Sequence, residues 1–364
     1  MYNVAIIGCG RISHKIAEGI AKNSGRMKLV VLCDPIEKKM FETEKTYSKK
    51  IDIEVSLSKY KDYKEILKQN KIDIAIISTE SGYHEEIGLY FLENGVNLII
   101  EKPLAMSIEG AQKLVDTANK NNLKLAASHQ NRFNYPIQLL KKAIKKNKLG
   151  KIFNGMARIL WTRDDNYYLQ APWRGTWALD GGTLMNQCIH NIDLINWMME
   201  DEIDTVYSQT SNYIRNIEAE DYGVIIIRYK SGKIATIEGS AIIFPKNLEE
   251  TLTITGEKGT VVIGGMAVNK INTWRVEGDN EEEYLSIDCG DPNSVYGYGH
   301  EALYKDFLDA LDENRDPLVD GKAGLEAVKI ILAAYKSQKT GLPVKFNEFK
   351  DFSTLDMKNI NLKK

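Results

Sequence analysis

The sequence predicts an α/β protein of two domains, the first of which is built on a doubly wound parallel sheet. In residues 1–130, short and continuously apolar runs alternate with segments of helical periodicity, which is typical of parallel strands covered by helices on both faces. In the second half, strand-like runs follow one another with turn signals between them, which indicates a further sheet. The 364 residues are enough for two cores. We place the predicted domains at 1–125 and 126–364.

The first half is expected to contain five strands and at least three helices. The expected strands are 4–7, 28–33, 72–78, 96–100 and 124–128, and the expected helices are 15–22, 60–70 and 84–94. Ligands of doubly wound sheets bind at the carboxyl ends of the strands. We therefore look for functional residues directly after each expected strand.

A glycine-rich turn, residues 8–13, joins the first strand to the first helix, in a GxGxxS variant of the dinucleotide-binding fingerprint. The fingerprint requires a tight turn at Gly8, close approach of a pyrophosphate to the backbone at Gly10, and a small residue at Ser13. The amino terminus of the helix offers N–H groups and a positive dipole end to phosphates. We expect Arg11 and Ile12, in the same turn, to contact the cofactor.

Asp34 directly follows the second expected strand. A carboxylate at this position can accept hydrogen bonds from both ribose hydroxyls of adenosine and would repel a 2′-phosphate, which predicts NAD rather than NADP as the cofactor. The alternative interpretation is a turn carboxylate that has no ligand.

Three later strand ends carry further polar residues that would reach the same edge of the sheet. The predicted cofactor-binding residues there are Ser78, Thr79, His84, Glu101, Lys102 and Gln130. Lys102 follows a buried strand and precedes a proline that restrains the local backbone, so we expect its ammonium group to be directed at a reacting hydroxyl. The alternative is a surface lysine after a strand.

A second candidate site lies after Gly181 and Gly182, where a helix is expected to run from Thr183 to about Trp197. On this helix Asn186, His190 and Asp193 are spaced i, i+4 and i+7, which places an amide, an imidazole and a carboxylate on one face. Their neighbours are apolar, so the polar stripe is expected to face a cavity. The alternative is an ordinary buried histidine.

The second half is expected to contain six strands and two helices, followed by a polar, loosely held tail after Phe346. The strands are 151–161, 204–213, 222–229, 234–243, 250–255 and 259–263, and the helices are 298–311 and 322–337. A sheet covered by helices on one face leaves its other face for association, so we expect a homodimer or homotetramer.

An aromatic and charged insertion, 163–177, contains Trp173 and Arg174. These side chains can stack a sugar or base and pair with an anion. The alternative interpretation is that they only pack the loop.

The composition limits the range of partners. The chain has 48 basic and 50 acidic residues, so no general attraction to nucleic acid or membranes is expected. No secretory leader or bilayer-spanning run is recognisable, which predicts a cytoplasmic protein. The four cysteines lack CxxC spacing, so neither a disulfide framework nor a metal site is expected.

The order of three motifs resembles the Gfo/Idh/MocA oxidoreductases over nearly the whole chain. The motifs are Gly8-Cys9-Gly10, Glu101-Lys102-Pro103 and the stretch from Gly181-Gly182 to His190. The resemblance implies an amino-terminal Rossmann domain, a carboxy-terminal α/β domain with a large, mainly antiparallel sheet, and NAD(P)-dependent redox chemistry on a sugar or cyclitol hydroxyl. It also implies that Lys102 and His190 lie beside the nicotinamide and the substrate.

Two positions depart from the family pattern. Many members carry an aspartate four residues before the histidine, and here Asn186 cannot act as a base, so its expected role is to orient the substrate or His190. The usual Thr-Pro after the third strand is Thr79-Glu80, which leaves contacts of this loop with the nicotinamide open.

Within the family, residues 130–134 and 173–177 look most like the enzymes that oxidise UDP-N-acetylglucosaminuronate at C3. This resemblance implies a small-molecule sugar-nucleotide substrate, contacted by Arg132, Asn134, Trp173, Arg174, Asn186 and Asp193. A myo-inositol or free-sugar dehydrogenase and, more remotely, a non-catalytic NAD-binding sensor are the alternatives.

Overall fold

The computed structural model describes residues 1–290 and 297–358, together with residues 360 and 362. The chain forms two compact units. Unit 1 comprises residues 1–129 and 300–325, and unit 2 comprises residues 130–299 and 326–364. The units differ from the predicted domains 1–125 and 126–364 mainly because residues 300–325 return to the first unit.

Unit 1 is built on a six-stranded parallel sheet of order β3-β2-β1-β4-β5-β6, as the sequence predicts for a doubly wound fold. The strands are β1 (Tyr2–Ile7), β2 (Met27–Cys33), β3 (Ser58–Tyr60), β4 (Ile74–Ile77), β5 (Asn97–Ile100) and β6 (Leu125–Ala127). All four residues of β4 are fully buried, because helices cover both faces of the sheet. The continuously apolar runs of the sequence therefore form the centre of this unit.

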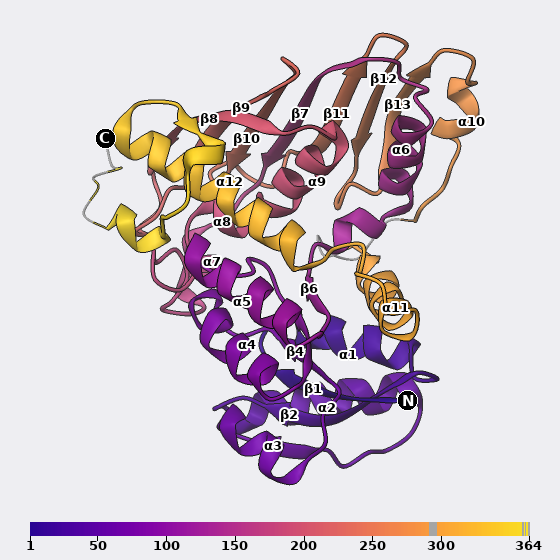
Figure 1. The fold of residues 1–364 in the computed structure, drawn as a ribbon, viewed down its shortest axis with the longest axis vertical. Coiled ribbons are helices and arrows are strands. Elements are labelled where there is room, and N and C mark those ends of the chain that lie inside the picture. The colour runs from indigo at the N-terminus through magenta and orange to yellow at the C-terminus, as the bar shows by residue number, and fades with distance from the viewer. Residues whose placement is uncertain (291–296, 359, 361, 363–364) are drawn as a thin grey trace. The chain divides into compact units, whose positions relative to one another are not determined.

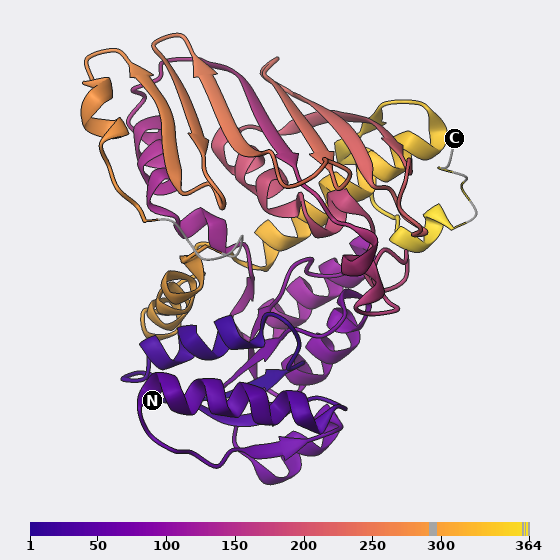
Figure 2. The ribbon, with the colours of Figure 1, turned by 180° about the vertical axis from the view of Figure 1, so that it is seen from behind.

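The two faces of this sheet are covered by different helices. Helices α1 (Ser13–Lys22) and α2 (Glu37–Ile51) pack against each other on the face seen in Figure 2, and α4 (His84–Glu93) and α5 (Ile108–Lys120) on the face seen in Figure 1. The helix expected at 60–70 is wrong in extent. Residues 58–60 join the sheet as β3, and only η1 (Tyr63–Glu65) and α3 (Ile66–Gln69) are helical. Asp62 accepts a hydrogen bond from the Lys64 amide and so starts the helical turn later than expected.

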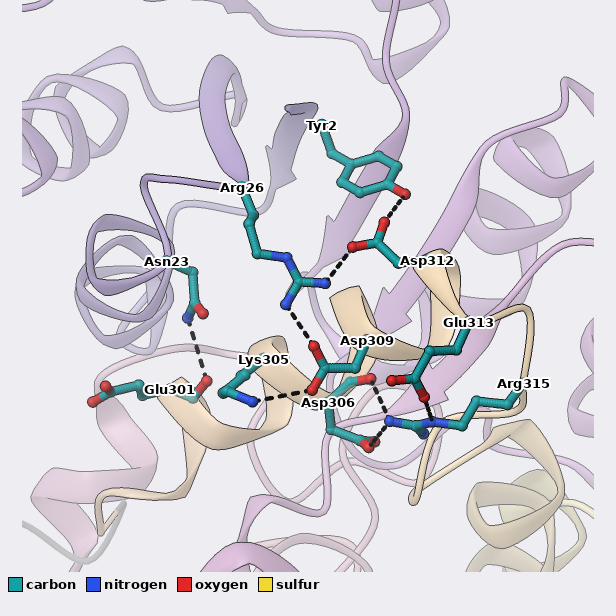
Figure 3. Close-up of polar contacts among 10 residues, drawn as sticks. All are labelled: Tyr2, Asn23, Arg26, Glu301, Lys305, Asp306, Asp309, Asp312, Glu313 and Arg315. Carbon is teal, nitrogen blue, oxygen red and sulfur yellow. Dashed lines mark hydrogen bonds and ion pairs between the residues drawn. The ribbon is translucent and has the colours of Figure 1, made fainter.

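Helix α11 (Gly299–Asp312) belongs to unit 1 from His300 onward, although it follows the sheet of unit 2 in the sequence. Tyr304 is completely buried and lies so close to Gly19 of α1 that a Cβ atom there would come within 2.5 Å of its ring. Arg26 donates to Asp309 at 2.5 Å and to Asp312 at 2.6 Å, and Asp312 also accepts from the Tyr2 hydroxyl (Figure 3). Burial of an aromatic ring and a forked ion pair thus hold the helix to this unit.

Unit 2 is built on an eight-stranded sheet of order β13-β12-β11-β7-β10-β9-β8-β14, in which β7 and β10 are parallel and the other described pairs are antiparallel. This confirms the mainly antiparallel sheet that the resemblance implies. The strands are β7 (Ile152–Leu160), β8 (Ile203–Ser211), β9 (Tyr222–Tyr229), β10 (Ile234–Ser240), β11 (Glu249–Gly256), β12 (Gly259–Gly264), β13 (Lys270–Val276) and β14 (Val344–Lys345). The last two were not predicted.

Helices of unit 2 cover one face of its sheet (Figure 1). They include α6 (Tyr135–Lys145), α9 (Ile189–Met199) and α12 (Gly321–Thr340), the last of which begins in unit 1 and continues in unit 2. The strands of this sheet face the viewer in Figure 2. Three apolar side chains of the strands, Met156, Ile226 and Ile234, are exposed. No helix among the described residues is long and apolar enough to cross a bilayer.

The expectation of a loosely held tail is wrong for the described residues after Phe346. Phe349, Phe352 and Met357 are buried. The Thr354 hydroxyl donates to the carbonyl oxygen of Trp177, and the Asn212 amide donates to the carbonyl oxygen of Leu362. Sparse apolar residues in a polar segment anchor the tail to unit 2.

Candidate cofactor and active-site residues

The glycine-rich turn between β1 and α1 is closed by contacts that only glycine permits at its first position. Gly8 has φ +93° and lies against the end of β4, where a Cβ atom would come within 2.6 Å of the Ser78 carbonyl group. The Ser78 hydroxyl donates to the Gly8 carbonyl oxygen at 2.7 Å. Ser78, at the end of β4, therefore holds the glycine-rich turn in place by this hydrogen bond.

Gly10 is in a different situation, because a Cβ atom there would meet no atom within 4 Å. The protein itself does not fill this space, which suits a group that approaches the backbone closely. Helix α1 begins after Ile12 without a side-chain cap. The open space and the uncapped helix end together fit the pyrophosphate of a dinucleotide.

Asp34 lies at the carboxyl end of β2 and is buried. Its Oδ2 atom accepts from the Cys9 amide at 2.9 Å, and its Oδ1 atom accepts from the Ile36 amide at 2.8 Å. Each oxygen retains a further lone pair, so the carboxylate is oriented and can still accept from ribose hydroxyls.

The end of β4 is joined to the end of β5 by His84. The imidazole Nδ1 lies 2.7 Å from the Pro103 carbonyl oxygen, and Nε2 lies 3.2 Å from that of Thr79. Burial lowers the pKa of His84, so the neutral ring donates to one of the two carbonyl groups, and the shorter contact to Pro103 is the better hydrogen bond. His84, at the start of α4, thus holds the loop after β5 through Pro103; its predicted contact with the cofactor stays a prediction.

Glu101 and Lys102 follow β5, and the Lys102–Pro103 peptide bond is cis. The buried Glu101 carboxylate accepts from the Ser128 hydroxyl at 2.8 Å and lies 3.8 Å from Nε2 of His300 on α11. Burial alone would raise the pKa of Glu101, but His300, Ser128 and Lys102 together hold it below its ordinary value. A carboxylate is therefore fixed beside Lys102, which is partly exposed.

In unit 2, Asp180 organises the turn that leads to the second candidate site. Its Oδ2 atom accepts from the Gly175 amide at 2.7 Å, and its Oδ1 atom accepts from the side-chain amide of Asn186. The NH₂ group of Asn186 donates to Asp180, and this hydrogen bond fixes the orientation of the side-chain amide. Position 186 has an amide where many family members have an aspartate, but the carboxylate of Asp180 lies within hydrogen-bonding distance of this amide.

The single helix expected from Thr183 to Trp197 is wrong. The structure has α8 (Thr183–Asn186) and α9, separated at Gln187 and Cys188. The Cys188 amide bonds to the Thr183 carbonyl oxygen, five residues back, and the Cys188 side chain packs where a Cβ atom on Gly239 of β10 would clash at 2.5 Å. Asn186 and His190 lie on either side of this break and are both partly exposed.

Glu220 is completely buried beneath the Gly181-Gly182 turn. Its Oε1 atom accepts from the Leu184 amide at 2.8 Å and from the Tyr335 hydroxyl at 2.9 Å. A Cβ atom on Gly182 would lie 1.9 Å from Oε2, so glycine is required there. Burial raises the pKa of Glu220 to about 8, although the two hydrogen bonds oppose the shift.

Arg132 and Asp193, both predicted to bind substrate, are bound to each other. Nε and Nη2 of Arg132 donate to the two oxygens of Asp193 at 2.8 and 2.6 Å, and the guanidinium stacks on Trp197. Asn134 donates to the Ala267 carbonyl oxygen, and Gln130 is buried. Roles of these four residues in binding ligands stay predictions, while their structural contacts are evident.

The predicted insertion folds as α7 (Asp165–Leu169) and a series of turns that carry aromatic side chains and arginines. The Arg174 guanidinium carbon lies 4.2 Å from the centre of the Tyr167 ring and 4.8 Å from that of Trp173. The Arg163 guanidinium carbon lies 5.3 Å from the same Tyr167 ring. The Tyr167 hydroxyl is 3.4 Å from Nε2 of Gln187, the residue after Asn186.

Comparison with known protein families covers most of the chain. Residues 2–129 match the NAD-binding Rossmann fold of the Gfo/Idh/MocA oxidoreductases, and residues 141–346 match the carboxy-terminal α/β domain of the same family. The chain belongs to the Gfo/Idh/MocA family. It is thus an NAD-dependent oxidoreductase, as its motifs predict.

Two solved structures of this family are similar over nearly their whole length. The WlbA dehydrogenase from Bordetella pertussis, in complex with NADH and UDP-GlcNAcA, is 31% identical with a TM-score of 0.83, covering 94% of this chain and 98% of that one. The WlbA dehydrogenase from Chromobacterium violaceum, with the same two ligands, is 32% identical with a TM-score of 0.84, covering 94% and 95%. Myo-inositol 2-dehydrogenase from Thermotoga maritima is 22% identical, covering 95% and 98%.

Several residues that shape this Gfo/Idh/MocA site were missed from the sequence. Glu220 and His300 act on predicted residues or their turn through contacts between positions far apart in the sequence. Asp180 acts on the nearby Gly175 and Asn186 through the fold of a turn, which no periodic pattern reveals. Tyr167 lay within the predicted aromatic insertion, but its contact with two arginines depends on the fold of the loop.

Proposed function

We propose that the protein oxidises the C3 hydroxyl of UDP-N-acetylglucosaminuronate with NAD, giving the 3-keto sugar nucleotide for surface polysaccharide synthesis. The observation that carries this proposal is the similarity to two WlbA dehydrogenases that bind NADH and UDP-GlcNAcA, at 31% and 32% identity over nearly complete chains. The aromatic and arginine-rich insertion is compatible with a charged sugar nucleotide.

Residues of unit 1 would hold the cofactor. Asp34 accepts from the adenosine ribose hydroxyls, and the backbone at Gly10 with the start of α1 holds the pyrophosphate. Further predicted contacts with the cofactor come from Gly8, Arg11, Ile12, Ser78, Thr79, His84, Glu101, Lys102 and Gln130, the last of which belongs to unit 2. Bound NAD supplies the acceptor for the C3 hydride.

The proton of the C3 hydroxyl passes to His190 or to Lys102. A neutral imidazole suits a base that works near pH 7. Lys102 would take the proton only as a neutral amine; as an ammonium group it would instead stabilise the forming alkoxide while His190 takes the proton. Asn186, oriented by Asp180, forms a hydrogen bond with a substrate hydroxyl. The products are the ketone, reduced nicotinamide and one proton.

The test is reduction of nicotinamide by the purified protein with UDP-N-acetylglucosaminuronate, UDP-N-acetylglucosamine or myo-inositol, with and without 2-oxoglutarate. We expect reduction with the uronate alone and further turnover with 2-oxoglutarate if bound cofactor is recycled. Lys102→Ala should lose most of kcat while NAD still binds. Unimpaired turnover in that variant would refute the role of Lys102.

A second candidate function is oxidation of myo-inositol or a free sugar. The observation that favours it is the similarity over nearly the whole chain to a myo-inositol 2-dehydrogenase. Activity with myo-inositol and none with either sugar nucleotide would establish this alternative. The absence of activity with all three, with NAD bound tightly, would favour the non-catalytic sensor.

The outward face of the eight-stranded sheet supports a homo-oligomer. Met156 of β7 and Ile226 of β9 both lie opposite Thr236 of β10, and the two apolar side chains are exposed. An apolar patch at the centre of an open sheet is characteristic of association surfaces. We propose that two copies of the chain pack through this face.

A further inference from the structure

We propose that Arg163 and Arg174, held against the ring of Tyr167, form the binding site for an acidic group of the substrate, with Tyr167 as the residue that determines specificity for it. These three residues are called the arginine clamp below. The inference rests on the proposed function, because it concerns the substrate of the same active site.

The first argument is that the clamp carries positive charge that the protein does not neutralise. Neither Arg163 nor Arg174 has an acidic partner within ion-pair distance among the described residues. The Arg174 guanidinium donates no hydrogen bond to a described residue, and its Nε atom is buried without a partner. Arg163 donates to the Thr162 carbonyl oxygen from Nη1. A guanidinium has five N–H donors, and buried donors require acceptors, so the clamp is suited to an incoming oxyanion.

The nearby carboxyl groups are engaged elsewhere or neutral. Asp165 is 3.6 Å from Arg215. Asp180 accepts from Gly175 and Asn186. Burial raises the pKa of the Glu250 carboxyl group to about 8, although the positive charge of Arg163 opposes this shift. This carboxyl group is therefore protonated at neutral pH. These three carboxyl groups therefore do not neutralise the positive charge of the clamp.

The second argument is orientation. A guanidinium stacked on an aromatic ring keeps its plane fixed and its N–H edge available for two parallel hydrogen bonds to one oxyanion. Each arginine lies over two rings: Arg174 is 4.2 Å from the centre of the Tyr167 ring and 4.8 Å from that of Trp173. Arg163 is 4.6 Å from the centre of the Trp161 ring and 5.3 Å from that of Tyr167, the ring that the two arginines share. The aromatic rings therefore restrain both guanidinium groups on one side of the loop.

The third argument is connection to the reacting residues within unit 2. Arg174 precedes Gly175, whose amide donates to Asp180, and Asp180 in turn accepts from Asn186. Tyr167 contacts Gln187 at the break between α8 and α9. An acidic group bound by the clamp would therefore be held at a defined distance from Asn186.

The experiment is calorimetric titration of the NAD-loaded protein with UDP-N-acetylglucosaminuronate, UDP-N-acetylglucosamine, D-glucuronate and pyrophosphate. The variants are Arg163→Gln, Arg174→Gln and Tyr167→Leu, with Lys142→Gln on the exposed side of α6 as the charge-matched control. Thermal melting checks that each variant folds. Arg174→Lys tests orientation, because lysine keeps the charge but cannot form the parallel pair.

We expect the two arginine substitutions to weaken binding of the uronate nucleotide about 10- to 100-fold, the loss typical of hydrogen bonds to a charged group. Arg174→Lys should restore part of the affinity, Tyr167→Leu should weaken binding by a similar factor, and Lys142→Gln should not change it. Equal losses for both sugar nucleotides and pyrophosphate would assign the clamp to the diphosphate. Losses restricted to the uronate nucleotide and glucuronate would assign it to the carboxylate.

Two outcomes separate failure of this inference from failure of the proposed function. If the wild type binds and oxidises the uronate nucleotide, and folded Arg163→Gln and Arg174→Gln bind it equally well, the clamp is refuted and the proposed function stands. If the wild type binds neither nucleotide but binds pyrophosphate or glucuronate in an Arg174-dependent way, the substrate is a different acid and the clamp stands. If no anionic probe binds, both are refuted.

Discussion

Glu220 should make the protein less stable as the pH rises, and Glu220→Gln should remove this effect. The carboxyl group is buried under Gly182, and its pKa is raised from 4.5 to about 8. Between these two pH values the folded protein retains a proton that the unfolded chain releases. The contribution of Glu220 to the free energy of unfolding is therefore fully present below pH 4.5 and is lost as the pH rises through 8. One pKa unit corresponds to about 1.4 kcal/mol, so the total effect is up to about 5 kcal/mol.

The expected measurement compares urea unfolding of the wild type and Glu220→Gln at pH 6, 7 and 8. Relative to the wild type, the glutamine variant should gain about 2 kcal/mol between pH 6 and pH 8, because the amide cannot ionise. Glu257→Gln, in the exposed turn between β11 and β12, is the control and should show no such trend. A difference between wild type and Glu220→Gln that stays constant with pH would refute the reasoning.

Three further substitutions test cofactor choice, the docking of α11 and association. Asp34→Ser should raise KM for NAD and lower the preference for NAD over NADP about tenfold or more, since the oriented carboxylate is removed; an unchanged ratio of kcat/KM values would contradict its role. Arg26→Met should lower the free energy of unfolding by about 1 kcal/mol, less at high salt, because both ion pairs to α11 are lost; a salt-independent change would argue against them. Ile226→Lys should reduce the mass measured by light scattering if the open sheet face joins two copies, and an unchanged oligomer would exclude this face.

Much of the fold could be predicted because burial on both faces makes a strand continuously apolar. β4 and β5 were recognised in this way, and the parallel sheet of unit 1 followed from their alternation with helices. β13 was missed because its exposed positions carry polar residues such as Lys270 and Arg275 between the buried ones. In the sequence this mixture resembles a polar loop. β14 has only two residues and is defined by its pairing with β8.

The candidate site was predictable where a motif is local and not where it depends on tertiary contacts. The turn at Gly8 and the carboxylate at Asp34 could be placed from spacing alone, and the structure shows both held by backbone contacts. The break before α9 could not, and the Cys188 side chain at this break packs against Gly239, which lies far away in the sequence. The pairing of Arg132 with Asp193, 61 residues apart, is equally invisible to periodicity.

The return of residues 300–325 to unit 1 affects how the protein can fold during synthesis. Residues 1–129 leave the ribosome first, but the helix that carries His300 and Tyr304 is made roughly 170 residues later, on the order of 10 to 35 s at ordinary rates of translation. During that interval the surface that receives Tyr304 is uncovered and Glu101 is without His300. The nascent cofactor-binding unit therefore depends on a late segment for its completion, and a fragment that ends at residue 129 would retain this exposed surface permanently.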